Sequence, residues 1–243
     1  MAPAWRLWLA AVALMAFPGM SSIVAADASS NPEVVCGSVI KLESDTHKGF
    51  RLVTQDVAYG GGSGQMSVTT NPESDEDGYW VVRGAPGYPC EPGHTLATGD
   101  VIRLQHMDSR RWLHSHKLPA PLSGTRAHEV SSLGSDEESD TGDEWELFLA
   151  TKGAKAWRRG DKVKLKHKDT EAWLSATGQK FPRPIQGHGE VAAVSRRGDG
   201  GTAWVAREGV YLPTRDLKQL EEQEREGELL ESDGQPAKQH MEL

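Results

Sequence analysis

The sequence lacks the motifs that accompany most hydrolytic and nucleotide-binding sites. It contains no GxSxG and no HExxH, and the GGGSG stretch at residues 60–64 has neither the lysine nor the following helix of a phosphate-binding loop. Carboxylate pairs occur where acidic residues run together, in segments that we interpret as exposed loops. Asn31 and Asn71 are the only asparagines, and because proline follows each, N-glycosylation is not expected. We therefore predict a protein that is not an enzyme and that uses no cofactor.

Long apolar runs are also scarce, and the one at the start of the chain has the pattern of a secretory signal peptide. Residues 7–17 are apolar, follow Arg6, and end before a Pro-Gly pair and a stretch of small residues. We assign residues 1–26 to this signal, with cleavage after Ala26 or after Ala28. No other stretch approaches the length of a membrane span, so we expect no membrane insertion of the mature chain.

Basic residues are outnumbered by acidic ones. The chain has 27 Lys and Arg against 35 Asp and Glu, and loss of Arg6 with the signal peptide leaves a net charge of −9. This balance argues against nucleic acid as a partner. The acidic residues cluster at 135–146 and between 216 and 233. Such runs are usually solvated surface, and the alternative for 135–146 is a contact with a basic partner.

Only two cysteines occur, Cys36 and Cys90. In an oxidising compartment an even number favours a disulfide, and the alternative is two buried free thiols. A bridge between them closes a loop whose loss of entropy in the unfolded chain stabilises the fold by roughly 4 kcal/mol.

The chain contains one segment three times. GSVIKLESDTHKGF begins at residue 37, GDVIRLQHMDSRRW at 99 and GDKVKLKHKDTEAW at 160, and we align them without a gap. This alignment places three aromatic residues in one column: Phe50, Trp112 and Trp173. A valine column keeps the same offsets of 62 and 61, and each repeat closes on a tryptophan: Val68, Val130 and Val191, then Trp80, Trp145 and Trp204.

The apolar residues of each repeat alternate with polar ones, as in Ile102-Arg103-Leu104, which is typical of half-buried strands. Three units of about four strands would each expose edges alone, and a closed arrangement hides them. We therefore predict an all-β fold, a β-trefoil spanning residues 35–212 with repeats at 37–89, 99–150 and 160–212. Its aromatic columns should meet at the pseudo-threefold axis, and the predicted disulfide should clip the first repeat shut.

Residues 99–116 concentrate the candidate site residues. Three histidines there could bind zinc, but no carboxylate or cysteine completes an obvious ligand set, so we predict no metal site. A second interpretation makes Arg110, Arg111, His114 and His116 the polar lining at the mouth of one trefoil lobe, suited to a sugar or an anion. The alternative is that these residues satisfy hairpin and turn hydrogen bonds.

The chain ends in His240, Met241, Glu242 and Leu243, a variant of the K/H-D-E-L retrieval address. Together with the signal peptide it predicts residence in the lumen of the endoplasmic reticulum (ER). Met241 replaces the usual acidic residue, which leaves the retrieval strength open and allows for a secreted pool. We expect the acidic tail, 213–243, to be a short helix or disordered and to keep this address accessible.

Several landmarks together carry a resemblance to a known family. They are VVCGSVIKLES, GGGSGQMSV, LHSH followed by PLSG at 121–124, FPRPIQGHGEV and the terminal tetrapeptide. In this order they resemble the stromal cell-derived factor 2 family, whose core is three MIR motifs. Two departures are RLVTQDVAYG in the first repeat, where relatives usually keep LHSH-like residues, and an acidic stretch before Trp145 that is about three residues longer than its counterparts.

The resemblance implies a β-trefoil in the ER lumen that joins a J-domain co-chaperone and the chaperone BiP and helps to keep unfolded clients soluble. The rival interpretation is a glycan-binding module, because trefoils often bind sugars. An exposed aromatic for sugar stacking is not evident, since the closing tryptophans and the Phe50 column are predicted core. A glycan array with His114 and His116 replaced separates the two interpretations.

Overall fold

The structure, a computed structural model, describes residues 31–215. The predicted signal peptide (1–26) and residues 216–243, with the predicted tail helix and the retrieval tetrapeptide, lie outside the described residues. No helix within 31–215 is long and apolar enough to cross a membrane.

Within residues 31–215, twelve strands form three sets of four, here called units one to three. Unit one contains β1 (Val39–Ser44), β2 (Arg51–Ala58), β3 (Met66–Asn71) and β4 (Trp80–Gly84). Unit two contains β5 (Val101–His106), β6 (Trp112–Ala120), β7 (Gly124–Leu133) and β8 (Trp145–Leu149). Unit three contains β9 (Lys162–His167), β10 (Trp173–Lys180), β11 (Gly189–Val194) and β12 (Trp204–Val210). One 3-10 turn precedes the last strand of each unit: η1 (Glu76–Gly78), η2 (Thr141–Asp143) and η3 (Gly200–Thr202).

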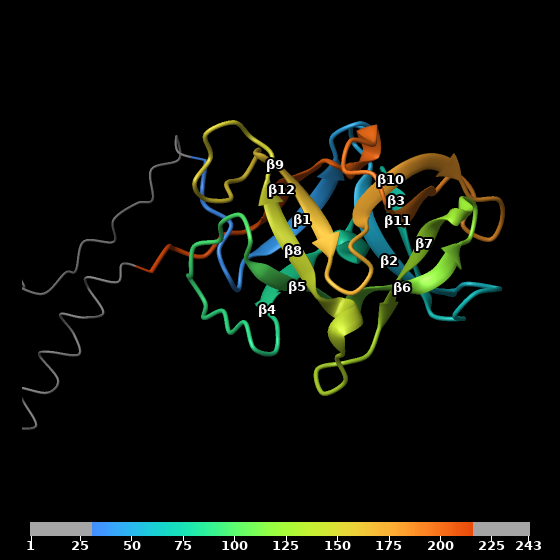
Figure 1. Cartoon of the computed structure of the whole chain (residues 1–243), viewed down its shortest axis with the longest axis horizontal. Coiled ribbons are helices and arrows are strands. Elements are labelled where there is room, and N and C mark those ends of the chain that lie inside the picture. Colours follow the sequence, from blue (N-terminus) through green and yellow to red (C-terminus); the bar gives the residue numbers. More distant parts are fainter. Residues whose placement is uncertain (1–30, 216–243) are drawn as a thin grey trace, which may run out of the picture. The chain divides into compact units, whose positions relative to one another are not determined.

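The first and last strands of the units close into a six-stranded barrel. The pairings run from β1 through β4, β5, β8, β9 and β12 and back to β1, all antiparallel. The remaining strands form three hairpins, which pair with one another through β3, β7 and β11. A closed barrel capped by this hairpin triplet is a β-trefoil, as predicted. Figure 1 shows the hairpins at the end opposite residues 31 and 215.

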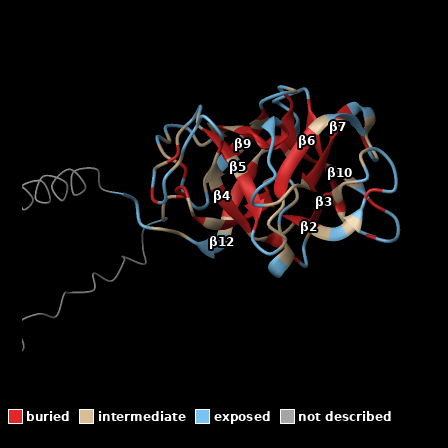
Figure 2. Ribbon diagram, turned by 90° about the horizontal axis from the view of Figure 1, so that it is seen from below, coloured by how far each residue is buried: buried red, intermediate tan, exposed pale blue. Residues whose placement is uncertain are grey.

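The core follows from the alternation of the sequence. In β9, Val163 and Leu165 are buried while the lysines between and before them are not. The closing tryptophans, Trp80, Trp145 and Trp204, are fully buried and each donates its Nε1–H to a carbonyl of its own unit's second strand, at 2.9, 2.9 and 3.0 Å. Figure 2 shows buried strands surrounded by exposed loops. Each indole thus has an internal partner for its only polar group.

The ungapped alignment of the repeats is wrong by one residue after the first strand. In the turn that follows this strand, the same hydrogen bond recurs in each unit: Ser44 N to Phe50 O, His106 N to Arg111 O and His167 N to Ala172 O. Phe50 therefore matches Arg111 and Ala172, and Arg51 takes the place of Trp112 and Trp173. Phe50 is half-exposed under the Lys180 ammonium, 3.6 Å from the ring centre, so the three-membered aromatic column does not exist.

Cys36 and Cys90 form the predicted disulfide, with their Cα atoms 5.8 Å apart. Cys36 lies just before β1 and Cys90 in the linker after β4. Two backbone hydrogen bonds, Cys36 N to His94 O and Gly93 N to Cys36 O, hold the same linker against the start of the unit. The bridge therefore fastens the linker between units one and two to the first strand of the barrel.

Candidate binding surface

The two arginines of the predicted site are directed at different acidic residues. Arg110 occupies the left-handed position of the β5–β6 turn (φ 61°), and its Nη2 lies 2.6 Å from Asp136 Oδ1. Arg111 Nη1 lies 2.7 Å from Asp56 Oδ1, in β2 of unit one. The acidic residues hold the two guanidinium groups apart, so the pair does not form one anion site.

The two histidines of β6 each meet a buried carboxylate. His114 Nδ1 is 2.9 Å from Asp143 Oδ1, and His116 Nε2 is 3.2 Å from Glu129 Oε1. The sequence showed no carboxylate that completes a ligand set with these histidines, because the acidic residues that meet them come from η2 and from β7. His114 itself is buried. These contacts favour the structural interpretation of LHSH over a ligand-lining one.

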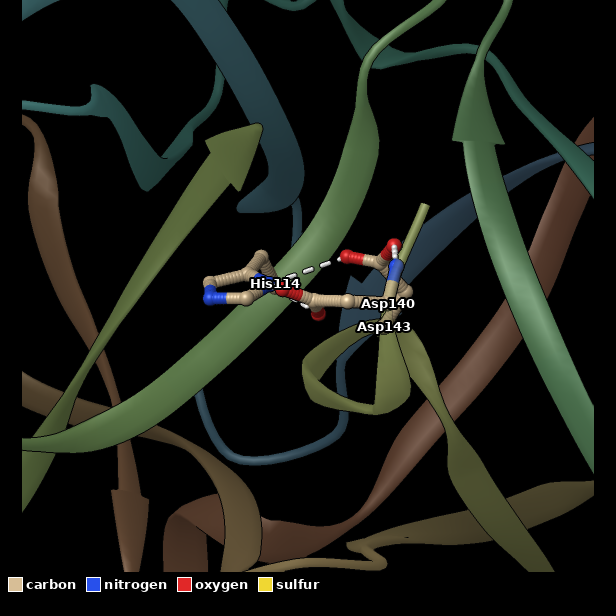
Figure 3. Close-up of side chains that lie close together, drawn as sticks. All are labelled: His114, Asp140 and Asp143. Carbon is tan, nitrogen blue, oxygen red and sulfur yellow. Dashed lines mark hydrogen bonds and ion pairs between the residues drawn. The ribbon is translucent and has the colours of Figure 1, made fainter. Parts of the chain in front are cut away.

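His114, Asp140 and Asp143 bring their ligand-type atoms within 4.8 Å of one another (Figure 3). The carboxylates are already used by η2, which they cap: Asp143 Oδ2 accepts from Asp140 N and Ser139 Oγ, and Asp140 Oδ1 accepts from Gly142 N. The His114 imidazole donates to the remaining Asp143 oxygen. Hydrogen bonds thus account for the geometry of this cluster without a metal ion.

The positions in unit three that match the two histidines of β6 also carry polar side chains. In β10, Ser175 and Thr177 take the positions of His114 and His116, and they line a cavity of about 360 Å³ together with Ser123, Arg126 and Asp199. Unit two also has a cavity, of about 340 Å³, but Leu133, Asp140 and Asp143 are among its lining residues and His114 and His116 are not. The serine and threonine of unit three thus line a cavity at the strand positions where unit two has its histidines.

A larger and more apolar cavity, of about 480 Å³, lies at the hairpin triplet. The loops that follow β2, β6 and β10 contribute to it, so it lies at the pseudo-threefold axis, where all three units meet. Its lining is mostly aliphatic, aromatic and proline: Val57, Ala58, Tyr59, Pro119, Ala120, Pro121, Leu122, Phe181, Pro182, Pro184 and Ile185, with Gly60, Gly61, Gly62, Ser67, Glu129 and Arg183. Several of these residues belong to the landmarks of the family resemblance, but the sequence did not indicate that they line a cavity.

Two fully buried glutamates lie at matching positions of the triplet, Glu129 in β7 and Glu190 in β11. Each accepts hydrogen bonds from the hairpin loop of the preceding unit. Glu129 accepts from Ser63 Oγ, and Glu190 accepts from Leu122 N and Ser123 N at 2.7 and 2.9 Å. The buried carboxylates therefore fasten successive hairpins together.

The sequence carries a signal for this pair that the search for acidic runs missed. Glu129 and Glu190 each stand alone on a strand, directly before the valine column of their repeat. Because paired carboxylates were sought in acidic runs, a single acid repeated in two units was not recognised. Unit one has Ser67 at the matching position, so this buried carboxylate is present in two of the three units.

Comparisons with known proteins agree with this architecture. The family model for the MIR domain matches residues 54–199. The stromal cell-derived factor 2-like protein of Arabidopsis thaliana is 43% identical over 194 residues, covering 79% of this chain and 87% of that protein. The stromal cell-derived factor 2 of Bos taurus is 40% identical over 215 residues, covering 88% of this chain and 97% of that protein. The chain belongs to the stromal cell-derived factor 2 family.

The crystal structure of the SDF2-like protein from Arabidopsis thaliana matches this family member with a TM-score of 0.72 and 42% identity. The match covers 76% of this chain and 99% of that one. The fold predicted from the repeats is therefore the fold of the family.

The acidic loop of this stromal cell-derived factor 2 relative divides into an exposed and a buried part. Asp136, Glu137, Glu138 and Asp140 are exposed, whereas Asp143 and Glu144 are buried against the barrel. The interpretation of the whole run 135–146 as exposed is thus wrong for its last acids. Because Asp136 binds Arg110 and Asp140 caps η2, the glutamates at 137 and 138 carry the charge that is free to meet a partner.

We expect this family member to lose stability as the pH falls from 7 to 5. Burial lowers the pKa of His167 and of His106 below the ordinary value of 6.5. Protons then bind the unfolded chain more readily than the folded one, so acid favours unfolding. The stability that comes from keeping these two histidines neutral is therefore fully present above pH 6.5 and decreases as the pH falls below it. Urea unfolding at pH 5, 6 and 7 should show a shallower decline in H167Q than in the wild-type chain, and an unchanged decline in H94Q, at an exposed site. Equal declines in all three proteins would contradict the assignment.

Proposed function

We propose that the protein is a non-enzymatic adaptor of the ER lumen that associates with a J-domain co-chaperone and with BiP in protein quality control. Membership of the stromal cell-derived factor 2 family carries this proposal, because the relatives align over most of their length. The predicted signal peptide and the retrieval-like terminus support the location. The candidate site residues are held in hydrogen-bonded clusters that stabilise the trefoil. This structural role supports a binding function for the fold in place of a catalytic one.

The direct test is recovery of partners from the lumen. Tagged mature protein, from residue 27 onward and with its C-terminus kept, is crosslinked gently in ER lumen, purified and analysed by mass spectrometry. Stoichiometric recovery of a J-domain protein with BiP supports the proposal. Recovery of glycoproteins alone, released by free sugar, supports the glycan-binding rival.

The exposed part of the acidic loop gives a sharper test of how a partner approaches. In E137K/E138K we expect association with the J-domain partner to slow several-fold at low salt and to converge with the wild-type rate at high salt, because exposed charges steer encounter and are screened. The matched control is E73K/E76K, which reverses two exposed acids in unit one. Stopped-flow association rates at two ionic strengths decide the matter, and identical rates for E137K/E138K and wild type at low salt would remove the loop from the interface.

A further inference from the structure

The cavity at the hairpin triplet is preformed. Four prolines line it, Pro119, Pro121, Pro182 and Pro184, and the fixed φ of proline restricts the loops that carry them. Its volume, about 480 Å³, falls within the range of sites that hold small ligands or side chains. The rings of Tyr59 and Phe181, which both line it, lie with their centres 6.3 Å apart. A ligand would find an apolar space that needs little reorganisation.

Negative charge lies beneath these apolar walls. Glu129 lines the cavity and is fully buried, and its hydrogen-bond donors are Ser63 and His116. Glu190, equally buried, is bonded by backbone N–H groups and by serine, threonine and glutamine side chains. Among the ion pairs of residues 31–215, neither carboxylate meets a lysine or an arginine.

The hydroxyl of Tyr59 is affected by the negative charge of the same two glutamates. It donates to the backbone at the centre of the triplet, 2.9 Å from Val130 O, and burial raises its pKa, with a further contribution from Glu129 and Glu190. Arg183, on the rim, is exposed and does not take part in the ion pairs of the described residues. The cavity thus combines apolar walls with a carboxylate that, within residues 31–215, contacts His116 but no lysine or arginine.

We propose that this cavity binds an extended polypeptide segment that inserts a bulky apolar side chain and carries a lysine or arginine beside it. The apolar side chain fills the space between the three hairpin loops. The cation lies over the rings of Tyr59 and Phe181, where the carboxylate that lines the cavity, Glu129, attracts it. The choice of a polypeptide over a free amine rests on the proposed function, which supplies unfolded chains and a protein partner as ligands.

The test uses the purified full-length protein and capped tetrapeptides. The probe is acetyl-Gly-Phe-Lys-Gly-amide, compared with peptides in which Phe is replaced by Ser, or Lys by Gln or Glu. Dissociation constants come from saturation-transfer-difference NMR titrations. We expect replacement of Phe to abolish saturable binding, Lys to Gln to weaken it about five- to tenfold, and Lys to Glu to weaken it further.

Two variants place the binding at this cavity. Ala58 is exposed and lines the cavity, so A58W narrows it without disturbing the core, and we expect it to weaken the Phe-Lys peptide at least tenfold. E129Q should remove the preference for Lys over Gln while keeping the need for Phe. E190Q is the matched control, because it changes the equivalent buried carboxylate that does not line the cavity.

The outcomes separate this inference from the proposed function. Equal affinity for the Lys and Glu peptides, or unchanged affinity in A58W, would overturn it even if the lumenal pulldown recovers the J-domain partner. A change of oligomeric state in A58W without an effect on peptide binding would assign the cavity to a second copy of the chain and also overturn it. If the pulldown fails while the peptides bind as expected, the cavity stands and the adaptor role falls.

Discussion

Replacement of Trp145 by alanine is expected to lower the free energy of unfolding by about 3–5 kcal/mol, a large part of the stability of an ordinary domain. The side chain is fully buried where unit two meets unit three. Its ring centre lies 4.9 Å from that of His167, and its Nε1–H donates to Leu113 O at 2.9 Å. Removal of the indole leaves a cavity in the barrel and a buried carbonyl without its donor.

A phenylalanine at the same position separates these two effects. W145F keeps an aromatic ring but removes the donor to Leu113, so we expect a loss of about 1–3 kcal/mol. Equilibrium urea unfolding followed by circular dichroism measures both variants. W157A is a useful comparison, because Trp157 is equally buried but its Nε1 has no hydrogen-bond partner among the described residues. A loss below about 1 kcal/mol in W145A would contradict the role assigned to this residue.

Loss of the disulfide should have an effect of similar size. The double variant C36A/C90A removes a bridge that spans 54 residues of sequence, and the entropy released to the unfolded chain corresponds to about 4 kcal/mol. The folded state should change little, because the backbone hydrogen bonds of Cys36 with His94 and Gly93 remain. Most of the effect therefore acts through the unfolded chain.

The measurement compares urea unfolding of C36A/C90A with that of the wild-type chain, each with and without reductant. Reduction should bring the wild-type chain close to the variant and leave the variant unchanged. If the oxidised wild-type chain and the variant have equal midpoints, the bridge contributes nothing, and the backbone bonds of the linker alone hold the start of β1.

Most of the fold could be predicted because the repeats encode it locally. Alternating residues such as Val163 and Leu165 specify strands, and the recurring tryptophans specify a shared core. The one-residue error came from the turns: unit one reaches its second strand one residue later than units two and three, and its β2–β3 hairpin is one residue shorter. The two changes cancel, so the valine column keeps its spacing and conceals both.

The candidate site was harder to predict because its contacts join distant parts of the chain. His116 meets Glu129 across a hairpin, and Arg111 meets Asp56 from another unit. Histidine density in a segment is visible in a sequence, whereas its carboxylate partners are not. The apolar cavity was hard to predict for the same reason, because the hairpin loops of three units build it and none of them encloses it alone.

The pairing of β1 with β12 has a consequence for synthesis of the chain. Ser44 and Trp204 are partners in that ladder and stand about 160 residues apart. Contacts of such sequence separation slow folding, because a long loop must close before they form. A nascent chain therefore emerges with its first strand unpaired on one side, and the barrel is completed only when the last strand has left the ribosome. For much of its own synthesis, this protein resembles an unfolded chain with an open sheet edge.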